Sequence, residues 1–133
     1  MSPPDAQFSA QLLLVFLGSG LGGVLRYLFG GWVQRFGKEA HFPIGTLAVN
    51  LIGCLLAGLL AGAFAHRWPM REEYRVAVVI GLLGGFTTFS SFGLETYALI
   101  TTGQPGRAAL NIALSAGLGL AAIWLGYRLA TAA

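Results

Sequence analysis

Hydroxyl side chains gather in the middle of one long apolar stretch of this sequence. Four of them lie within the five residues 87–91, and two adjacent glycines, Gly84 and Gly85, come shortly before them. Each glycine weakens a helix by about 1 kcal/mol. If this stretch is a helix that crosses a membrane, it is expected to break here, near the middle of the membrane; it is the third of the four such helices predicted below. Such a break frees carbonyls, which suit a small cation, and amides, which together with hydroxyls suit a small anion. The pattern predicts an ion site inside an apolar segment.

Phenylalanines alternate with these hydroxyls. Phe86, Phe89 and Phe92 are spaced by three and fall roughly on one face of a helix. Rings in membrane helices usually pack against neighbours or lipid. The edge of a phenyl ring carries partial positive charge, however, so rings presented edge-on in a broken region could hold an anion without a full positive charge.

Two further pairs of polar residues lie inside apolar stretches, each pair four residues apart. Thr46 and Asn50 form one pair, and Asn111 and Ser115 form the other. Residues four apart share a helix face. Either pair could line a narrow polar path, or could instead hold the helices together through interhelical hydrogen bonds.

Two charges also lie within apolar segments, Arg26 and Glu95. Charged groups at membrane depth are costly and are candidates for function. Glu95 lies past the middle of its segment, where it could reach an aqueous vestibule. Arg26 either extends to the membrane surface or favours anions near the mouth of a pore.

The elements that carry these residues are predicted to be membrane helices. Of the 133 residues, 56% are hydrophobic and 10% are charged, whereas about a quarter are charged in a soluble domain. Continuous apolar runs exclude barrel strands, which alternate. We therefore predict an all-α membrane protein, one transmembrane domain over residues 1–133 with four helices, at about 12–33, 44–65, 76–100 and 108–129.

Small residues are expected to bring these helices close together. The sequence has 20 glycines, several of them four residues apart, as in the pairs Gly18 and Gly22, Gly58 and Gly62, and Gly81 and Gly85. This spacing lets helix backbones approach each other in lipid.

Basic residues barely specify an orientation in the membrane. With the N-terminus inside, four basic residues are inside (Arg67, Arg71, Arg75, Arg128) and three are outside (Arg35, Lys38, Arg107). The positive-inside rule acts on larger differences. Insertion in both orientations and an antiparallel homodimer are therefore expected; an ordinary topology with a weak signal is the alternative. The formal net charge of +3 is scattered, so nucleic acid is not an expected partner.

Three motifs, in order, resemble those of the CrcB/Fluc family of fluoride channels. The segment 84–92 reads GGFTTFSSF, 45–53 reads GTLAVNLIG, and 22–27 reads GGVLRY. Together they span most of the chain. The resemblance implies a bacterial inner-membrane channel built as a dual-topology antiparallel dimer. It also implies two pores lined by both subunits and a sodium ion at the central interface, held by the carbonyls of Gly84 and Thr87.

The resemblance also implies which residues line the fluoride path. Phe89 and Phe92 match the ring pair whose edges face fluoride, and Asn50 matches the pore asparagine. Ser90, Ser91 and Ser115 fall on a polar track, and Thr46 and Arg26, from the second and first motifs, complete the expected set. Two positions depart from the family: Ser91 replaces a common threonine, and Asn111 stands where an aromatic hydroxyl is more usual.

The function expected from these features is passive fluoride export, which lowers fluoride toxicity and needs no enzyme chemistry. The main alternative is a small dual-topology cation or multidrug exporter. That class needs an acidic residue in the first span, where this sequence has Arg26 and no acid. A scaffold subunit is a further alternative, but it would not need a polar, glycine-rich third span.

Overall fold

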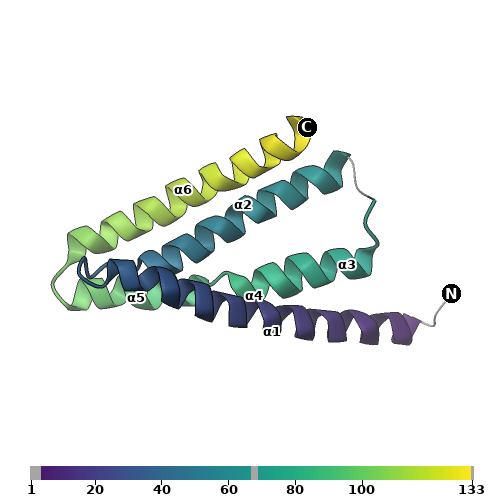
Figure 1. Ribbon diagram of the computed structural model, residues 1–133, viewed down its shortest axis with the longest axis horizontal. Coiled ribbons are helices and arrows are strands. Elements are labelled where there is room, and N and C mark those ends of the chain that lie inside the picture. Colours follow the sequence, from purple (N-terminus) through teal and green to yellow (C-terminus); the bar gives the residue numbers. More distant parts are fainter. Residues whose placement is uncertain (1–3, 67–68, 133) are drawn as a thin grey trace.

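The computed structural model describes residues 4–66 and 69–132, and every element in them is helical. Three helices are continuous, and a fourth stretch is divided into shorter helices (Figure 1). The elements are α1 Pro4–Gly37, α2 Ile44–His66, α3 Glu72–Val76, η1 Ala77–Leu83, α4 Gly84–Phe86, α5 Phe89–Thr101 and α6 Pro105–Ala132. Four helical stretches are long and apolar enough to cross a membrane, as predicted.

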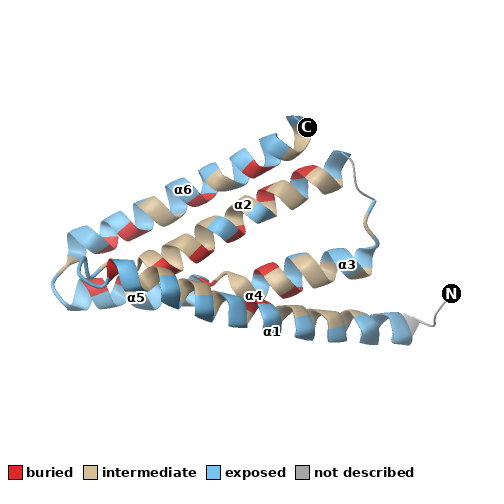
Figure 2. Cartoon of the chain, viewed as in Figure 1, coloured by how far each residue is buried: buried red, intermediate tan, exposed pale blue. Residues whose placement is uncertain are grey.

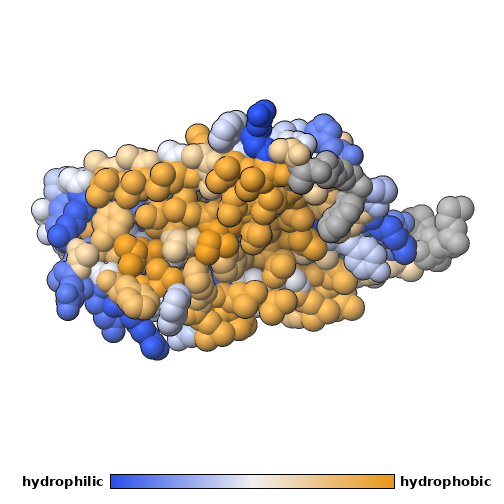
Figure 3. Space-filling model, turned by 45° about the horizontal axis from the view of Figure 1, so that its top comes forward, coloured by the Kyte–Doolittle hydropathy of each residue, from blue (hydrophilic) through white to orange (hydrophobic). Residues whose placement is uncertain are grey.

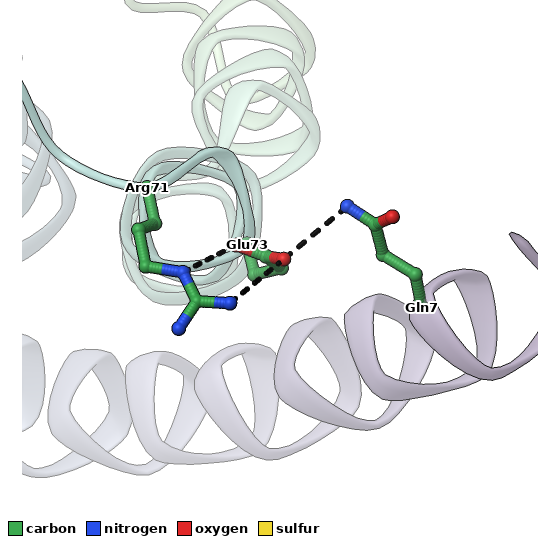
Figure 4. A network of polar contacts seen from close by, with 3 residues as sticks. All are labelled: Gln7, Arg71 and Glu73. Carbon is green, nitrogen blue, oxygen red and sulfur yellow. Dashed lines mark hydrogen bonds and ion pairs between the residues drawn. The ribbon is translucent and has the colours of Figure 1, made fainter. Parts of the chain in front are cut away.

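Helix α1 extends well beyond the apolar run that starts at Leu12. Asp5 lies in its first turn, where a carboxylate complements the helix dipole. Two residues later, Gln7 Nε2 donates to Glu73 Oε1 at 3.2 Å, and Arg71 Nε pairs with Glu73 Oε2 at 3.5 Å (Figure 4). The polar start of α1 is thereby tied to the start of α3.

Glycines let the helices pack in two close groups. Helix α2 lies beside α6, and α1 lies beside η1 and α4 (Figure 1). A Cβ on Gly126 would collide with the Leu55 carbonyl, and one on Gly22 with the Leu82 carbonyl. At both places only a glycine permits the observed approach of the two backbones.

Few of the described residues are buried. Four apolar residues form the buried core of the described chain, namely Val49, Leu83, Leu99 and Ala108 (Figure 2). Large apolar side chains instead face outward, and in Figure 3 they cover the middle of the visible face while hydrophilic residues lie toward both ends. An apolar belt between polar ends is the surface of a multi-pass membrane protein.

The helix ends gather at two opposite ends of the bundle. The start of α1, the end of α2, the start of α3 and the end of α6 share one end (Figure 1). At the other end, Arg107 Nη1 donates to the Ala40 carbonyl at 2.6 Å, which joins the first turn of α6 to the α1–α2 connection. Arg67 and Trp68 lie outside the described residues. Two sets of basic residues therefore lie at opposite ends of the bundle. Arg71, Arg75 and Arg128 are at the first end, and Arg35, Lys38 and Arg107 are at the second.

Candidate functional site

The backbone between α4 and α5 is extended at two residues. Thr87 has φ −84° and ψ 156°, and Thr88 has φ −152° and ψ 115°. The segment before them, η1, is a seven-residue π-helix, a rare form that is frequent at functional sites. Two glycines and two β-branched threonines make this stretch a poor α-helix, so the chain can change direction here at low cost.

Asn50 on α2 binds the backbone of Thr88 in both directions. Its Nδ2 donates to the Thr88 carbonyl at 3.0 Å, and its Oδ1 accepts from the Thr88 N–H at 2.8 Å. Free backbone groups at membrane depth must find partners inside the protein. The Asn50 amide supplies both, so α2 fixes the position of the extended residues.

Thr88 is the N-cap of α5. Its Oγ1 accepts from the Ser91 N–H at 3.1 Å and lies 3.0 Å from Ser91 Oγ and 3.3 Å from Ser90 Oγ. A threonine at this position satisfies one of the free amides at the start of a helix. Thr88 was not among the predicted site residues, although a threonine followed by a new apolar helix is a recognisable cap signal.

These two arrangements release two carbonyl groups. In a continuous helix, the Thr88 N–H would bond to the Gly84 carbonyl and the Ser91 N–H to the Thr87 carbonyl. Here the first N–H donates to Asn50 and the second to Thr88 Oγ1. Arg26 Nη1 approaches the Thr87 carbonyl at 3.4 Å, while the N–H and hydroxyl of Thr87 itself both donate to the Leu83 carbonyl.

A cavity of about 740 Å³ opens on one side of the Asn50–Thr88 contact. Arg26, Thr46, Ser91 and Glu95 line it, so it contains both charges that the sequence places inside the spans. Thr46 Oγ1 donates to Glu95 Oε1 at 2.6 Å, and Glu95 Oε2 is a buried oxygen that has no hydrogen-bond partner within the described residues. The cavity has room for several water molecules, and its polar side chains could bind them.

A second cavity, of about 400 Å³, lies on the other side of this contact. Its lining is more apolar and includes Asn50, Gly84, Thr87 and Phe89. Thr88 lines both cavities. The residues that join α2 to the extended backbone therefore lie between the polar cavity and the cavity next to the Phe89 ring.

Comparison with known proteins identifies the family of this chain. The family described as CrcB-like protein, Camphor Resistance (CrcB), matches residues 13–127, which is most of the chain. The chain belongs to the CrcB family. The resemblance found in the three motifs is thereby confirmed.

Relatives in the CrcB family are highly similar along nearly their whole length. A protein of Methylobacillus flagellatus named fluoride-specific ion channel FluC is 44% identical over 119 residues, which cover 90% of this chain and 93% of that protein. Fluoride-specific ion channel FluC 1 of Rubrobacter xylanophilus is 49% identical over 120 residues, with 90% and 92% covered. A Rhizobium etli protein with the FluC name is 44% identical over 113 residues, with 85% and 90% covered.

The phenyl rings of this CrcB-family chain lie at the start of α5. The centroids of Phe89 and Phe92 are 5.4 Å apart and the rings are tilted by 46°. Phe92 is half-buried, whereas Phe89 is 83% exposed although it adjoins the second cavity. The two rings are therefore tilted neighbours, and Phe89 is the more exposed of the two.

Three of the predicted site residues line neither cavity, namely Phe92, Ser90 and Ser115. Ser90 is exposed, and its hydroxyl lies near that of Thr88. Ser115 on α6 is half-buried, and within residues 4–66 and 69–132 its hydroxyl makes no hydrogen bond. The chain thus brings Arg26, Thr46, Asn50, Thr87 and Ser91 around the extended backbone, whereas Ser90 is exposed and Ser115 is half-buried on α6, away from both cavities.

Gln34 was missed by the sequence analysis because it falls just beyond the expected end of the first span. Its Nε2 donates to the Phe42 carbonyl and its Oε1 accepts from the Gly45 N–H, both at 2.9 Å. It also lines the larger cavity. Gln34 therefore fixes the start of α2 against α1, and so the positions of Thr46 and Asn50 along the bundle.

Proposed function

We propose that this protein is a fluoride-selective channel that releases cytoplasmic fluoride down its electrochemical gradient. One observation carries the proposal: relatives 44–49% identical over about nine-tenths of the chain are named fluoride-specific ion channels. The function is transport through a pore, not enzyme catalysis. The rival exporter function is not favoured, because the apolar part of the first span, residues 12–33, contains Arg26 and no acid.

A passive channel is sufficient for this task. Hydrogen fluoride is a weak acid that crosses membranes uncharged and dissociates in the cytoplasm, so fluoride accumulates there. A negative-inside potential drives an anion outward with about 2.3 kcal/mol per 100 mV. No coupled ion or nucleotide is required.

The site offers a plausible route for a small anion. The Arg26 guanidinium supplies positive charge in the larger cavity, and the Ser91 hydroxyl lies in its wall. The Thr46 hydroxyl lines the same cavity but donates to Glu95, so it would have to leave that carboxylate to donate to fluoride. Beyond the Asn50–Thr88 contact, the edges of Phe89 and Phe92 supply weaker positive potential. Fluoride holds its hydration shell tightly, so a narrow path of such groups selects it over chloride only if they replace that shell closely.

A second copy of the chain completes this path in the proposal. Phe89 is 83% exposed, and the nearby hydroxyl of Ser90 also faces outward. A hydroxyl that faces hydrocarbon at membrane depth is unfavourable unless another protein surface covers it. The four-against-three count of basic residues favours insertion in both orientations, so the proposed assembly is an antiparallel homodimer with Ser115 facing the shared pore.

The released carbonyls suit a sodium ion in the proposed dimer. Sodium prefers hard oxygen ligands, and Gly84 and Thr87 each have a carbonyl whose helical N–H partner is diverted elsewhere. Two such carbonyls from each subunit would hold the ion at the dimer centre. The ion would contribute positive charge and would hold the extended segments of the two chains against each other. We propose that the assembly lies in the inner membrane of a bacterium.

Liposome efflux tests the proposed function. Purified protein is reconstituted into vesicles loaded with potassium fluoride, and valinomycin starts efflux that a fluoride electrode records; vesicles loaded with chloride serve as the control. Fast fluoride release without chloride release is expected, and Phe89→Ala should slow it. A well-folded protein that releases neither ion, or releases both equally, would overturn the proposal.

A further inference from the structure

One amide is buried away from both cavities. Asn111 on α6 is only 2% exposed, and with Val49 it is one of the two largest fully buried side chains of the described chain. An amide is costly to bury unless it forms hydrogen bonds. Asn111 Nδ2 donates to Thr96 Oγ1 on α5 at 2.9 Å, and this buried contact is the hydrogen bond that joins α5 to α6 in the described residues.

The contact continues to the backbone of a pore residue. Thr96 Oγ1 lies 2.7 Å from the Phe92 carbonyl and donates to it. A hydroxyl has one hydrogen, so a threonine that donates to Phe92 can only accept from Asn111. The three groups therefore form a directional chain, from the Asn111 amide through the Thr96 hydroxyl to the Phe92 carbonyl.

This hydrogen-bond chain acts on a short helix. Helix α5 has 13 residues; Thr88 caps its start, and at its end Gln104 N–H donates to the Leu99 carbonyl at 2.8 Å. Thr96 lies between these two fixed points. A threonine hydroxyl bonded to the carbonyl four residues earlier also bends a helix slightly. The direction in which the first turns of α5 point thus depends on how Thr96 is held.

We propose that Asn111 is a positioning residue which, through Thr96, sets the orientation of the first turns of α5 and thereby of the Phe89 and Phe92 rings. The effect on ion selection rests on the proposed fluoride channel; the effect on ring position does not. The buried amide is kept because it directs the Thr96 hydroxyl toward Phe92. Two apolar side chains at positions 96 and 111 could fill the same space, but they could not fix the orientation of α5 through a hydrogen bond.

Paired substitutions separate positioning from stability. Thr96→Val leaves the buried Asn111 amide without its acceptor, so it should lower the unfolding temperature. The double variant Asn111→Leu with Thr96→Val replaces both partners by apolar groups of similar shape, which is close to neutral for stability. Thr96→Ser keeps the hydroxyl. Thr101→Val is the matched control, because its hydroxyl bonds to the Tyr97 and Ala98 carbonyls on the same helix without reaching α6.

Transport of fluoride and chloride by these variants is one readout. The double variant should keep the stability of the unmodified protein yet release fluoride about tenfold more slowly and discriminate less against chloride. Thr96→Ser and Thr101→Val should behave like the unmodified protein. A stable double variant with unchanged flux and selectivity, or a Thr96→Ser variant as defective as Thr96→Val, would overturn the proposal.

A second readout does not depend on transport. 4-Fluorophenylalanine is placed at position 92, and its ¹⁹F NMR signal is recorded in fluoride-free detergent solution. The double variant should shift or split this signal, whereas Thr101→Val should leave it unchanged. An identical signal in all three proteins would refute the positioning role even if the channel conducts fluoride. A shifted signal in the double variant, together with no fluoride efflux from the unmodified protein, would instead refute the proposed function alone.

Discussion

At the scale of single residues, the Asn50 amide has the contacts of a paired β-strand. It donates to and accepts from the same residue, Thr88, so both polar backbone groups of one extended residue are satisfied by one side chain. Few residue types can do this, because the side chain needs a donor and an acceptor side by side. Its amide is therefore committed to the backbone within a single subunit.

Removing this amide should disorganise the extended backbone and the ion path together. Asn50→Ala loses two hydrogen bonds worth about 1 kcal/mol each, so we expect fluoride efflux to fall by about tenfold or more. Electrode recordings from liposomes measure the change. Gln7→Ala is the control, since it removes an amide contact to Glu73 at the exposed end of α1. Equal efflux from the two variants would show that Asn50 is not part of the path.

The N-cap formed by Thr88 should stabilise the first turn of α5. Thr88→Val removes the oxygen that accepts from the Ser91 N–H, and loss of an N-cap costs about 1 kcal/mol. The amides at the start of α5 should then exchange with deuterium about fivefold faster. Hydrogen exchange followed by mass spectrometry measures this, and Thr88→Ser should restore the slow rate. Fast exchange in both variants would indicate that the hydroxyl does not cap the helix.

At the scale of elements, the bundle depends on backbone contact between α2 and α6. Gly126 lies against the Leu55 carbonyl and Gly58 against the Ile123 carbonyl, so each helix presents a glycine to the backbone of the other. Lipid tails are as apolar as leucine, and close packing rather than the hydrophobic effect holds such helices together.

A pair of glycine substitutions on α6 measures this dependence. Gly126→Ala places a Cβ against the Leu55 carbonyl, so we expect a clear loss of thermal stability in detergent. Gly117→Ala adds the same group where nothing lies within 4 Å, and there alanine should be neutral or stabilising by up to about 1 kcal/mol. Similar melting temperatures for the two variants would contradict the packing described for α2 and α6.

The four spanning helices were predictable because an apolar run of about 20 residues has few alternatives. The contacts of the polar residues were not. The spacing of Thr46 and Asn50 placed them on one face, but their partners, Glu95 and the Thr88 backbone, depend on how α2 is set against α5. Asn111 and Ser115 likewise share a face in sequence, yet Asn111 is buried against Thr96 while Ser115 is only half-buried.

At the scale of the whole molecule, the surface of the chain suggests a partner, which the proposed homodimer would supply. Large apolar side chains cover the middle of the face seen in Figure 3. The exposed Ser90 on α5 adds a hydroxyl to the outer surface. Lipid can cover the apolar residues but not the hydroxyls without cost. In the proposed homodimer, a second copy of the chain covers these hydroxyls, and the surface it offers depends on its orientation in the membrane. The balance of basic residues at the two ends of the chain governs that orientation.

Shifting this balance should separate the two orientations. Replacing Arg35 and Lys38 by glutamine leaves four basic residues at the N-terminal end against one at the other. Such a chain should insert only with its N-terminus inside, as a reporter fused to the C-terminus would record. The opposite bias comes from Glu39→Lys with Arg75→Gln and Arg128→Gln, which leaves two basic residues against four.

Either biased chain alone should fail to protect fluoride-exposed cells, because parallel copies cannot form an antiparallel dimer. Expressed together, the two biased chains restore both orientations in equal supply, so growth in fluoride should return. The control is co-expression of two chains with the same bias, which should remain sensitive. Full resistance from one biased chain, with its single orientation verified by the reporter, would mean that the path does not require an inverted partner and that another surface covers Phe89 and Ser90.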